Sequence, residues 1–353
     1  MTLKRRWSTG LAVVAALALL AARPLVRELS AADNGCTVEG VDRIVAVGDV
    51  HGAYEPLVAI LQAAGILDRR LRWDDGRAHL VQTGDILDRG PDSRKALDLL
   101  RRLEDDARRA GGAAHLLLGN HEVMRMLGDL RFVSPGEYGA FASATSNRTR
   151  QAFVDSAPAD LRPQLLKETP LGFVEMRQAF GRDGEYGRWL RKLDVAVKIN
   201  GILFLHGGIS PATAHMDCDA LNAAVRRELT SDLDRTRAEP LASLAAREDG
   251  PLWYRGLAEE PDAFSPQVDE ILSGQRARAI VVGHTVAPDG RIRTRFGGKI
   301  VQIDTGMQRA YVPAGRGSAL QIQQGVLTAI YEDGQQFLEN VPAQAVNAAA
   351  ASR

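Results

Sequence analysis

Cysteine is scarce in this chain. Only Cys36 and Cys218 occur among its 353 residues. Neither belongs to a C-x-x-C pair, so the sequence argues against a zinc site built from thiolates. The two cysteines lie far apart in sequence and can form a disulfide only in an oxidising compartment. The sequence leaves that pairing open.

An excess of either charge is also missing, because 44 Lys and Arg residues balance 44 Asp and Glu residues. No net field attracts polyanions, so we expect no nucleic acid as a partner and no charge-driven membrane binding. Apolar residues make up 45% of the chain and charged residues 25%, which is ordinary for a soluble globular protein. The length suits one large domain or two small ones.

Long hydrophobic runs are lacking as well. The apolar run at residues 11–22 is shorter than the roughly 20 residues that a transmembrane span needs. It follows a basic stretch at residues 4–6 and precedes small residues, which is the layout of a secretory signal peptide. We expect residues 1–32 to direct export to the periplasm or the medium, with an uncleaved inner-membrane anchor as the alternative. The tail, residues 343–353, is of low complexity and is expected to be disordered.

Short apolar strands alternate with glycine-containing polar loops and helices. Residues 44–47, 78–82 and 114–118 are each followed by such a loop. This alternation predicts an α/β fold with ligands collected at the carboxyl ends of the strands. The turn at residues 74–76 also predicts a hairpin between residues 71–73 and 78–82.

The strand signal disappears between residues 123 and 193, which we interpret as a mostly helical insertion over the site. It returns at residues 195–199 and 202–205, where Asn200 and Gly201 predict a tight hairpin. Residues 319–323 and 326–331 predict another hairpin near the end of the domain.

Residue types that bind metals recur where the predicted strands end. Mixed oxygen and nitrogen ligands without thiolate suit manganese, iron or zinc better than calcium. Two metals sharing a bridging carboxylate lower the pKa of a bound water and stabilise an in-line phosphoryl displacement. The candidate ligands are Asp49, His51, Asp85, Asn120, His206 and His284.

Three further residues fit the remaining needs of such a reaction. His121 is the histidine at a strand end that is not needed as a ligand, so it is the candidate proton donor to a leaving oxygen. Arg89 and Arg255 lie nearest the glycine-rich turns, and arginine matches phosphate oxygens bidentately.

The order of these motifs resembles the calcineurin-like metallophosphoesterases. The motifs are GDVHG at 48–52, GDILDRG at 84–90, GNHE at 119–122, HGG at 206–208 and GHT at 283–285. The DRG and GNHE forms resemble the phosphoprotein phosphatase branch. WYRG at 253–256 and IDTGM at 303–307 resemble its bacterial Shewanella-like protein phosphatases. The resemblance covers residues 42–332 and implies two mixed β-sheets packed as a sandwich flanked by helices.

The resemblance also implies a role for each site residue. One metal is held by Asp49, His51 and Asp85, and the second by Asp85, Asn120, His206 and His284. His121 is the general acid, and Asp88 orients and polarises it. Substrate phosphate is held by Arg89, Asn120 and Arg255. Family members attack phosphate monoesters directly with a metal-bridging hydroxide, and manganese is the ion we expect to support activity in vitro.

The implied substrate is a phosphorylated protein or peptide, with phosphotyrosine or phosphoserine/threonine, or a small phosphate ester. A dinucleoside polyphosphate hydrolase is an alternative, because residues 89–93 also resemble that branch. A catalytically idle metal-binding protein is a second alternative. Trp253 and Tyr254 are interpreted as packing residues. Whether Asp304 faces the site or only ends a strand stays open.

Overall fold

The computed structural model describes residues 35–343. The expected export segment at residues 1–32, and residues 344–353 of the expected tail, lie outside this range. Between residues 35 and 343, no helix combines the length and apolar character needed to cross a membrane.

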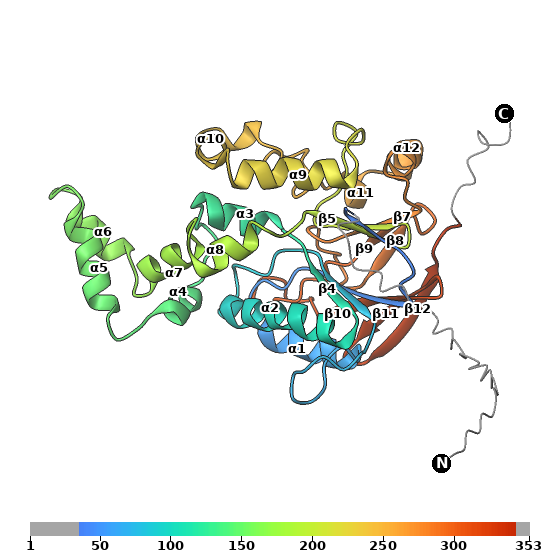
Figure 1. The fold of residues 1–353 in the computed structure, drawn as a ribbon, viewed down its shortest axis with the longest axis horizontal. Helices are drawn as coiled ribbons and strands as arrows, with labels where there is room; N and C mark the ends of the chain where they lie inside the picture. The colour runs from blue at the N-terminus through green and yellow to red at the C-terminus, as the bar shows by residue number, and fades with distance from the viewer. Residues whose placement is uncertain (1–34, 344–353) are drawn as a thin grey trace, which may run out of the picture. The chain divides into compact units, whose positions relative to one another are not determined.

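One sheet carries the strands β2, β3 and β4, which alternate with two helices along the chain (Figure 1). These three neighbours run parallel, and β10, β11 and β12 continue the sheet in antiparallel pairings. In spatial order the strands are β12 (Gly334–Asn340), β11 (Val326–Tyr331), β10 (Ser318–Gln323), β2 (Arg43–Val47), β3 (His79–Gln82) and β4 (Ala113–Leu116).

The second sheet has both parallel and antiparallel pairings too. Its central strands β6, β7 and β9 are parallel, while β5 and β8 pair antiparallel with β6 and β9. The order is β1 (Thr37–Val38), β5 (Ala196–Ile199), β6 (Ile202–Leu205), β7 (Ala279–Val282), β9 (Ile300–Gln302) and β8 (Arg293–Arg295). The predicted α/β class with two mixed sheets is therefore confirmed.

The apolar core between the sheets explains their packing. Ala46 and Val81 of the first sheet share one buried cluster with Phe204 and Val281 of the second. Side chains alternate along a strand, so the opposite faces must be covered by helices. Helix α2 (Ser93–Ala110) covers β4 on one side.

Helices lie on both outer faces of the sheet pair (Figure 1). Helix α1 (Tyr54–Ala63) accompanies α2, and its Leu57, Ile60 and Leu61 are buried. Helix α9 (Cys218–Leu229) contacts β5 on the other side. The remaining helices of the second half are α10 (Leu233–Ala238), α11 (Gly256–Glu259) and α12 (Ser265–Gln275).

The chain between β4 and β5 is helical. It begins with α3, whose first residues follow β4 directly, and then leads through five short helices toward β5 (Figure 1). These are α3 (Asn120–Leu127), α4 (Pro135–Phe141), α5 (Ser146–Asp155), α6 (Arg162–Glu168), α7 (Phe173–Phe180) and α8 (Glu185–Leu190).

Two of the three predicted hairpins form. Asn200 and Gly201 join β5 to β6 with φ of 50° and 72°, the left-handed values that a tight hairpin turn needs. The β10–β11 hairpin also forms. The predicted hairpin between residues 71–73 and 78–82 is wrong, because β3 pairs in parallel with β2 and Trp73 instead forms an isolated bridge with Leu67.

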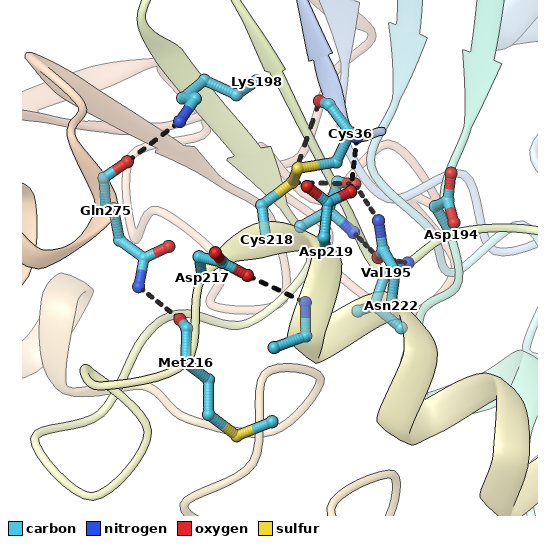
Figure 2. The surroundings of a disulfide bond; sticks show 12 residues. Cys36, Asp194, Val195, Lys198, Met216, Asp217, Cys218, Asp219, Asn222 and Gln275 are labelled. Atoms are coloured by element: carbon cyan, nitrogen blue, oxygen red, sulfur yellow. Dashed lines mark hydrogen bonds between the residues drawn. A yellow bond between two sulfur atoms is a disulfide. The ribbon is translucent and has the colours of Figure 1, made fainter. Parts of the chain in front are cut away.

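A disulfide joins Cys36, just before β1, to Cys218 in the first turn of α9 (Figure 2). Hydrogen bonds reinforce this junction. The Cys36 amide donates to Asp219 Oδ1 at 2.7 Å, and the Val195 amide donates to Asn222 Oδ1 at 2.8 Å. Helix α9 thus fixes both the start of the domain and the residue that precedes β5.

Candidate metal centre

The six predicted ligands converge at one end of the two sheets. Asp49, Asp85 and Asn120 follow β2, β3 and β4, and His206 and His284 follow β6 and β7. Asp85 lies at the middle: its Oδ2 is 3.3 Å from His206 Nε2 and 3.5 Å from His51 Nε2. All six side chains are buried. Each sheet therefore supplies part of one site.

Sharp turns aim these side chains into the site. His51, Asp85 and His284 adopt left-handed φ values of 48°, 57° and 64°, which non-glycine residues rarely do. Gly84, just before Asp85, is required for close approach. A Cβ there would lie 2.3 Å from the Gly119 nitrogen. Backbone strain of this kind persists where the surroundings fix the conformation, as they do at functional sites.

Backbone carbonyls orient three of the histidine rings. His51 Nδ1 lies 2.8 Å from the Leu87 oxygen, His206 Nδ1 lies 3.0 Å from the Thr83 oxygen, and His284 Nε2 lies 3.1 Å from the Trp253 oxygen. A ring that donates to a carbonyl from one nitrogen can present its other nitrogen to a metal ion. Metal-binding histidines are oriented in this way.

The other ring nitrogens converge. His206 Nε2 lies 3.1 Å from His284 Nδ1 and 2.9 Å from Asn120 Oδ1. The amide nitrogen of Asn120 faces Met124 Sδ at 3.8 Å, so its oxygen is the atom that faces His206. Imidazole nitrogens and amide or carboxylate oxygens are ligands of manganese, iron and zinc. The set of atoms therefore fits a metal centre.

The structure offers two groups of metal-type ligands that share Asp85. One contains His51 and His121, and the other contains His206 and His284. The first contains His121 in place of the predicted Asp49, whose Oδ2 lies 3.8 Å from His51 Nε2. The Nδ1 of His121 is already bonded to Asp88, and its Nε2 lies 3.8 Å from Asp85 Oδ2.

The pKa values of the site residues differ strongly from those of exposed groups of the same type. Burial alone would raise the pKa of Asp85, but the surrounding His206 and His121 hold it well below its usual range. Burial lowers the pKa of His51 to about 3, so its ring is neutral at physiological pH. A neutral imidazole and an ionised carboxylate are the forms that bind metals.

Asp304, left open by the sequence, faces the site. It is buried, its Oδ1 accepts from the Gly306 amide at 2.9 Å, and its carboxyl group hydrogen-bonds to Asp49. Burial raises the pKa of Asp49, and the nearby Asp304 and Asp85 raise it further.

Glu122 holds the loop that carries Asp85. Its Oε2 accepts from the amides of Asp85 and Gly119, and its Oε1 accepts from those of Ile86 and Leu87, at 2.8 to 3.1 Å. Glu122 belongs to the GNHE motif, but the sequence predicts no role for it. One buried carboxylate thus connects the loops after β3 and β4.

His121 and Asp88 form a buried pair beside the candidate ligands. His121 Nδ1 lies 2.6 Å from Asp88 Oδ2. Burial alone would lower the pKa of His121, but the carboxylates of Asp85 and Asp88 outweigh burial and raise it. The raised pKa favours the protonated ring, whose Nε2 lies 3.8 Å from Asp85 Oδ2.

The two predicted arginines lie at the edge of the site. Arg89 Nη2 is 3.4 Å from His121 Nε2, and its guanidinium stacks on Tyr311 at 3.6 Å from the ring centroid and on Phe132 at 5.8 Å. Arg255 is exposed and donates to the His284 carbonyl at 2.7 Å. Both guanidinium groups thus border the ligand cluster.

The fold and the clustered His and Asp residues define this chain as a metallophosphoesterase. The family model of the calcineurin-like phosphoesterases matches residues 42–288, so the chain belongs to that family. Members bind two metal ions, in agreement with the two groups that share Asp85.

Comparison with similar proteins shows to which members of the family the chain is related. A cold-active protein-tyrosine phosphatase of a psychrophile Shewanella sp. matches with a TM-score of 0.68 and 31% identity, covering 86% of this chain and 82% of that one. Shewanella-like protein phosphatase 1 of Plasmodium berghei is 26% identical, covering 75% and 67%. An uncharacterized protein of Schizosaccharomyces pombe is 32% identical, covering 82% and 80%. The chain is thus related to the Shewanella-like protein phosphatases.

Proposed function

We propose that this protein hydrolyses phosphate monoesters at a two-metal centre and acts on phosphorylated proteins or peptides. The observation that carries the proposal is the convergence of buried His and Asp side chains around Asp85, in two groups that could each hold a metal ion. Asp49, His51 and Asp85 hold one ion. The second ion is held by Asp85, Asn120, His206 and His284. Manganese, iron and zinc suit these ligands.

When bound, the two ions supply Lewis acidity and a nucleophilic water at neutral pH. The chain supplies the remaining groups. His121 donates its Nε2 proton to the leaving oxygen, since its Nδ1 is held by Asp88 and its pKa is raised. General acid catalysis of this kind contributes about 10²–10⁴-fold in rate.

Arg89 and Arg255 bind the phosphoryl oxygens. Asn120 is also expected from the sequence to bind phosphate, but its amide nitrogen, the donor such a contact needs, faces Met124 Sδ. Arg89 is kept in place by its stacking on Tyr311 and Phe132, which both remain exposed, at 54% and 43%. Two exposed aromatic rings beside a phosphate-binding arginine favour an aryl leaving group. This supports phosphotyrosine as a substrate, and the Shewanella relative is named a protein-tyrosine phosphatase.

A groove next to the ligands supports a peptide rather than a small ester. Its lining includes Met124, Leu127, Leu241 and Trp253. It adjoins the site because Met124 contacts the Asn120 amide and Trp253 contacts His284. Charged side chains also line it, namely Asp129, Arg131, Arg237 and Glu248. A groove with apolar walls and a few charged groups suits a peptide residue that flanks the phosphorylated one.

We also propose that the protein works after export, in the periplasm or outside the cell. The disulfide between Cys36 and Cys218 supports this, because such bonds persist in oxidising compartments. The signal-like residues 1–32 point the same way.

A substrate panel tests the function. Metal-stripped full-length protein is supplied with manganese and offered phosphotyrosine peptide, phosphoserine peptide and diadenosine tetraphosphate. We expect manganese-dependent phosphate release from the phosphotyrosine peptide. Turnover of the dinucleotide alone would assign the chain to the polyphosphate hydrolases. Metal binding without any turnover would identify an idle metal-binding protein.

A further inference from the structure

A buried arginine connects the His121–Asp88 pair to the helical segment. Arg125 lies one turn after His121 on α3 and is 4% exposed. Its Nη2 donates to Asp88 Oδ1 and also to Glu137 Oε2, the latter at 2.8 Å. Arg125 lies outside every motif that the sequence singles out.

The two oxygens of Asp88 are divided between two partners. Oδ2 faces His121 Nδ1 and Oδ1 accepts from Arg125. The backbone of Asp88 and Arg89 is left-handed at both residues, with φ of 72° and 67°. Two consecutive non-glycine residues in this region need outside support to stay there. Arg125 gives that support at the carboxylate.

Helix α4 sits on the same turn. Glu137 lies in its first turn, and Ser134, which caps it, donates from Oγ to the Gly90 carbonyl at 3.0 Å. A Cβ on Gly136 would lie 2.4 Å from Pro91 Cβ, so only glycine allows this approach. The start of α4 thus touches the turn after Asp88 directly and, through Arg125, Asp88 itself.

We propose that Arg125 is a positioning residue for the His121–Asp88 pair, and that Glu137 links this positioning to α4. The proposal rests on the proposed function, in which His121 is the general acid. Arg125 fixes the carboxylate that fixes the imidazole, so its loss lets the ring turn away from the leaving oxygen. Misplacement of a reacting group by about 1 Å can cost about 10²-fold in rate.

Opposite charges explain why Arg125 is buried together with two carboxylates. Asp88, Arg125 and Glu137 have side chains only 1% exposed. Removing one partner of a buried ion pair leaves an uncompensated charge, whereas replacing both by apolar residues is often neutral for stability. A double replacement can therefore remove the positioning without unfolding the protein.

Two substrates whose leaving groups differ in their need for a proton distinguish a loss of positioning from a loss of stability. p-Nitrophenolate leaves without a proton, but phenolate from phenyl phosphate needs the general acid. We expect Arg125→Met to lower kcat/KM for phenyl phosphate by about 10²-fold and that for p-nitrophenyl phosphate by less than about tenfold. The double variant Arg125→Met with Glu137→Met should show the same selective loss and a melting temperature above that of the single variant, because only Asp88 Oδ1 is then left without its partner. Arg125→Lys should retain part of the rate on phenyl phosphate.

Arg191 is the matched control. It is also buried, but its hydrogen bonds go to the carbonyls of Leu229 and Gly187, away from His121. Arg191→Met should lower stability and leave the ratio of the two kcat/KM values unchanged.

Equal losses on both substrates in the Arg125 single and double variants would overturn the proposal. His121→Asn tests the underlying function separately. If it loses phenyl phosphate turnover selectively while the Arg125 variants do not, the general acid stands and the positioning role fails. If His121→Asn shows no selective loss, the proposed function of His121 fails.

Discussion

His206 Nε2 and His284 Nδ1 face each other at 3.1 Å, while the opposite nitrogen of each ring faces a backbone carbonyl. The two rings come from neighbouring parallel strands, β6 and β7. Hydrogen bonds to the backbone fix their orientation.

The sharing of Asp85 predicts how metal content responds to mutation. Asp85→Asn should lose both ions, because its Oδ2 faces both groups of ligands, whereas His284→Asn should lose one. Metal per chain is measured by mass spectrometry after gel filtration. His79→Asn is the control, since His79 pairs with His115 away from the site and should keep both ions. Two ions on Asp85→Asn would contradict the assignment.

The raised pKa of His121 predicts a shift in the pH profile. A general acid works when protonated, so kcat/KM falls as the pH rises through the pKa of His121. Asp88→Asn removes a carboxylate that raises this pKa, and the basic limb should therefore move to lower pH. The measurement is kcat/KM for phenyl phosphate between about pH 5 and 9, the range in which histidine titrates.

Asp92→Asn provides the control for that profile. Asp92 pairs with Lys95 at the start of α2, at 2.8 Å. Its replacement should leave both limbs in place. A shift to higher pH in Asp88→Asn would contradict the role given to the His121–Asp88 pair.

The apolar groove predicts a substrate-dependent effect at Leu241, whose residue surface is 74% exposed. Leu241→Glu should raise KM for a phosphopeptide with an apolar flanking residue by about tenfold, because burying such a side chain is worth about 1.5–3 kcal/mol. KM for p-nitrophenyl phosphate should not change. Leu166→Glu on α6, also exposed, should affect neither substrate.

The disulfide predicts a large effect on stability. Cys36 and Cys218 are separated by 182 residues, and closing so long a loop is worth about 5 kcal/mol in the chain-entropy model. Replacing both cysteines by alanine should lower the urea midpoint accordingly. Reduction of the native protein should have the same effect, and an unchanged midpoint in both cases would show that the bond constrains little.

Much of the site could be predicted because its residues lie at the ends of short apolar strands. Asp49, Asp85 and His206 each follow such a strand, and the carboxyl ends of parallel strands meet at one edge. This rule places Asp49 and Asp85 together, whereas His206 follows a strand of the other sheet and was joined to them by the resemblance.

Other features could not be predicted because they depend on packing between distant segments. Arg125 lies on α3 outside the motifs, and Glu137 lies in a helix without a strand signal. The two meet Asp88 only in three dimensions. Strand β12 was missed because its sequence is largely polar and exposed. The hairpin at residues 71–82 failed because pairing with β2 outweighed the local turn preference.

The division of ligands between the two sheets has a mechanical consequence. Asp49 and Asp85 follow strands of one sheet, and His206 and His284 follow strands of the other. Ions bound among them would link the two sheets at the edge where the ligands lie. When force pulls the two sheets apart, the metal-loaded protein should separate first at the edge opposite the ligands. Its rupture force should be higher than that of the metal-stripped protein.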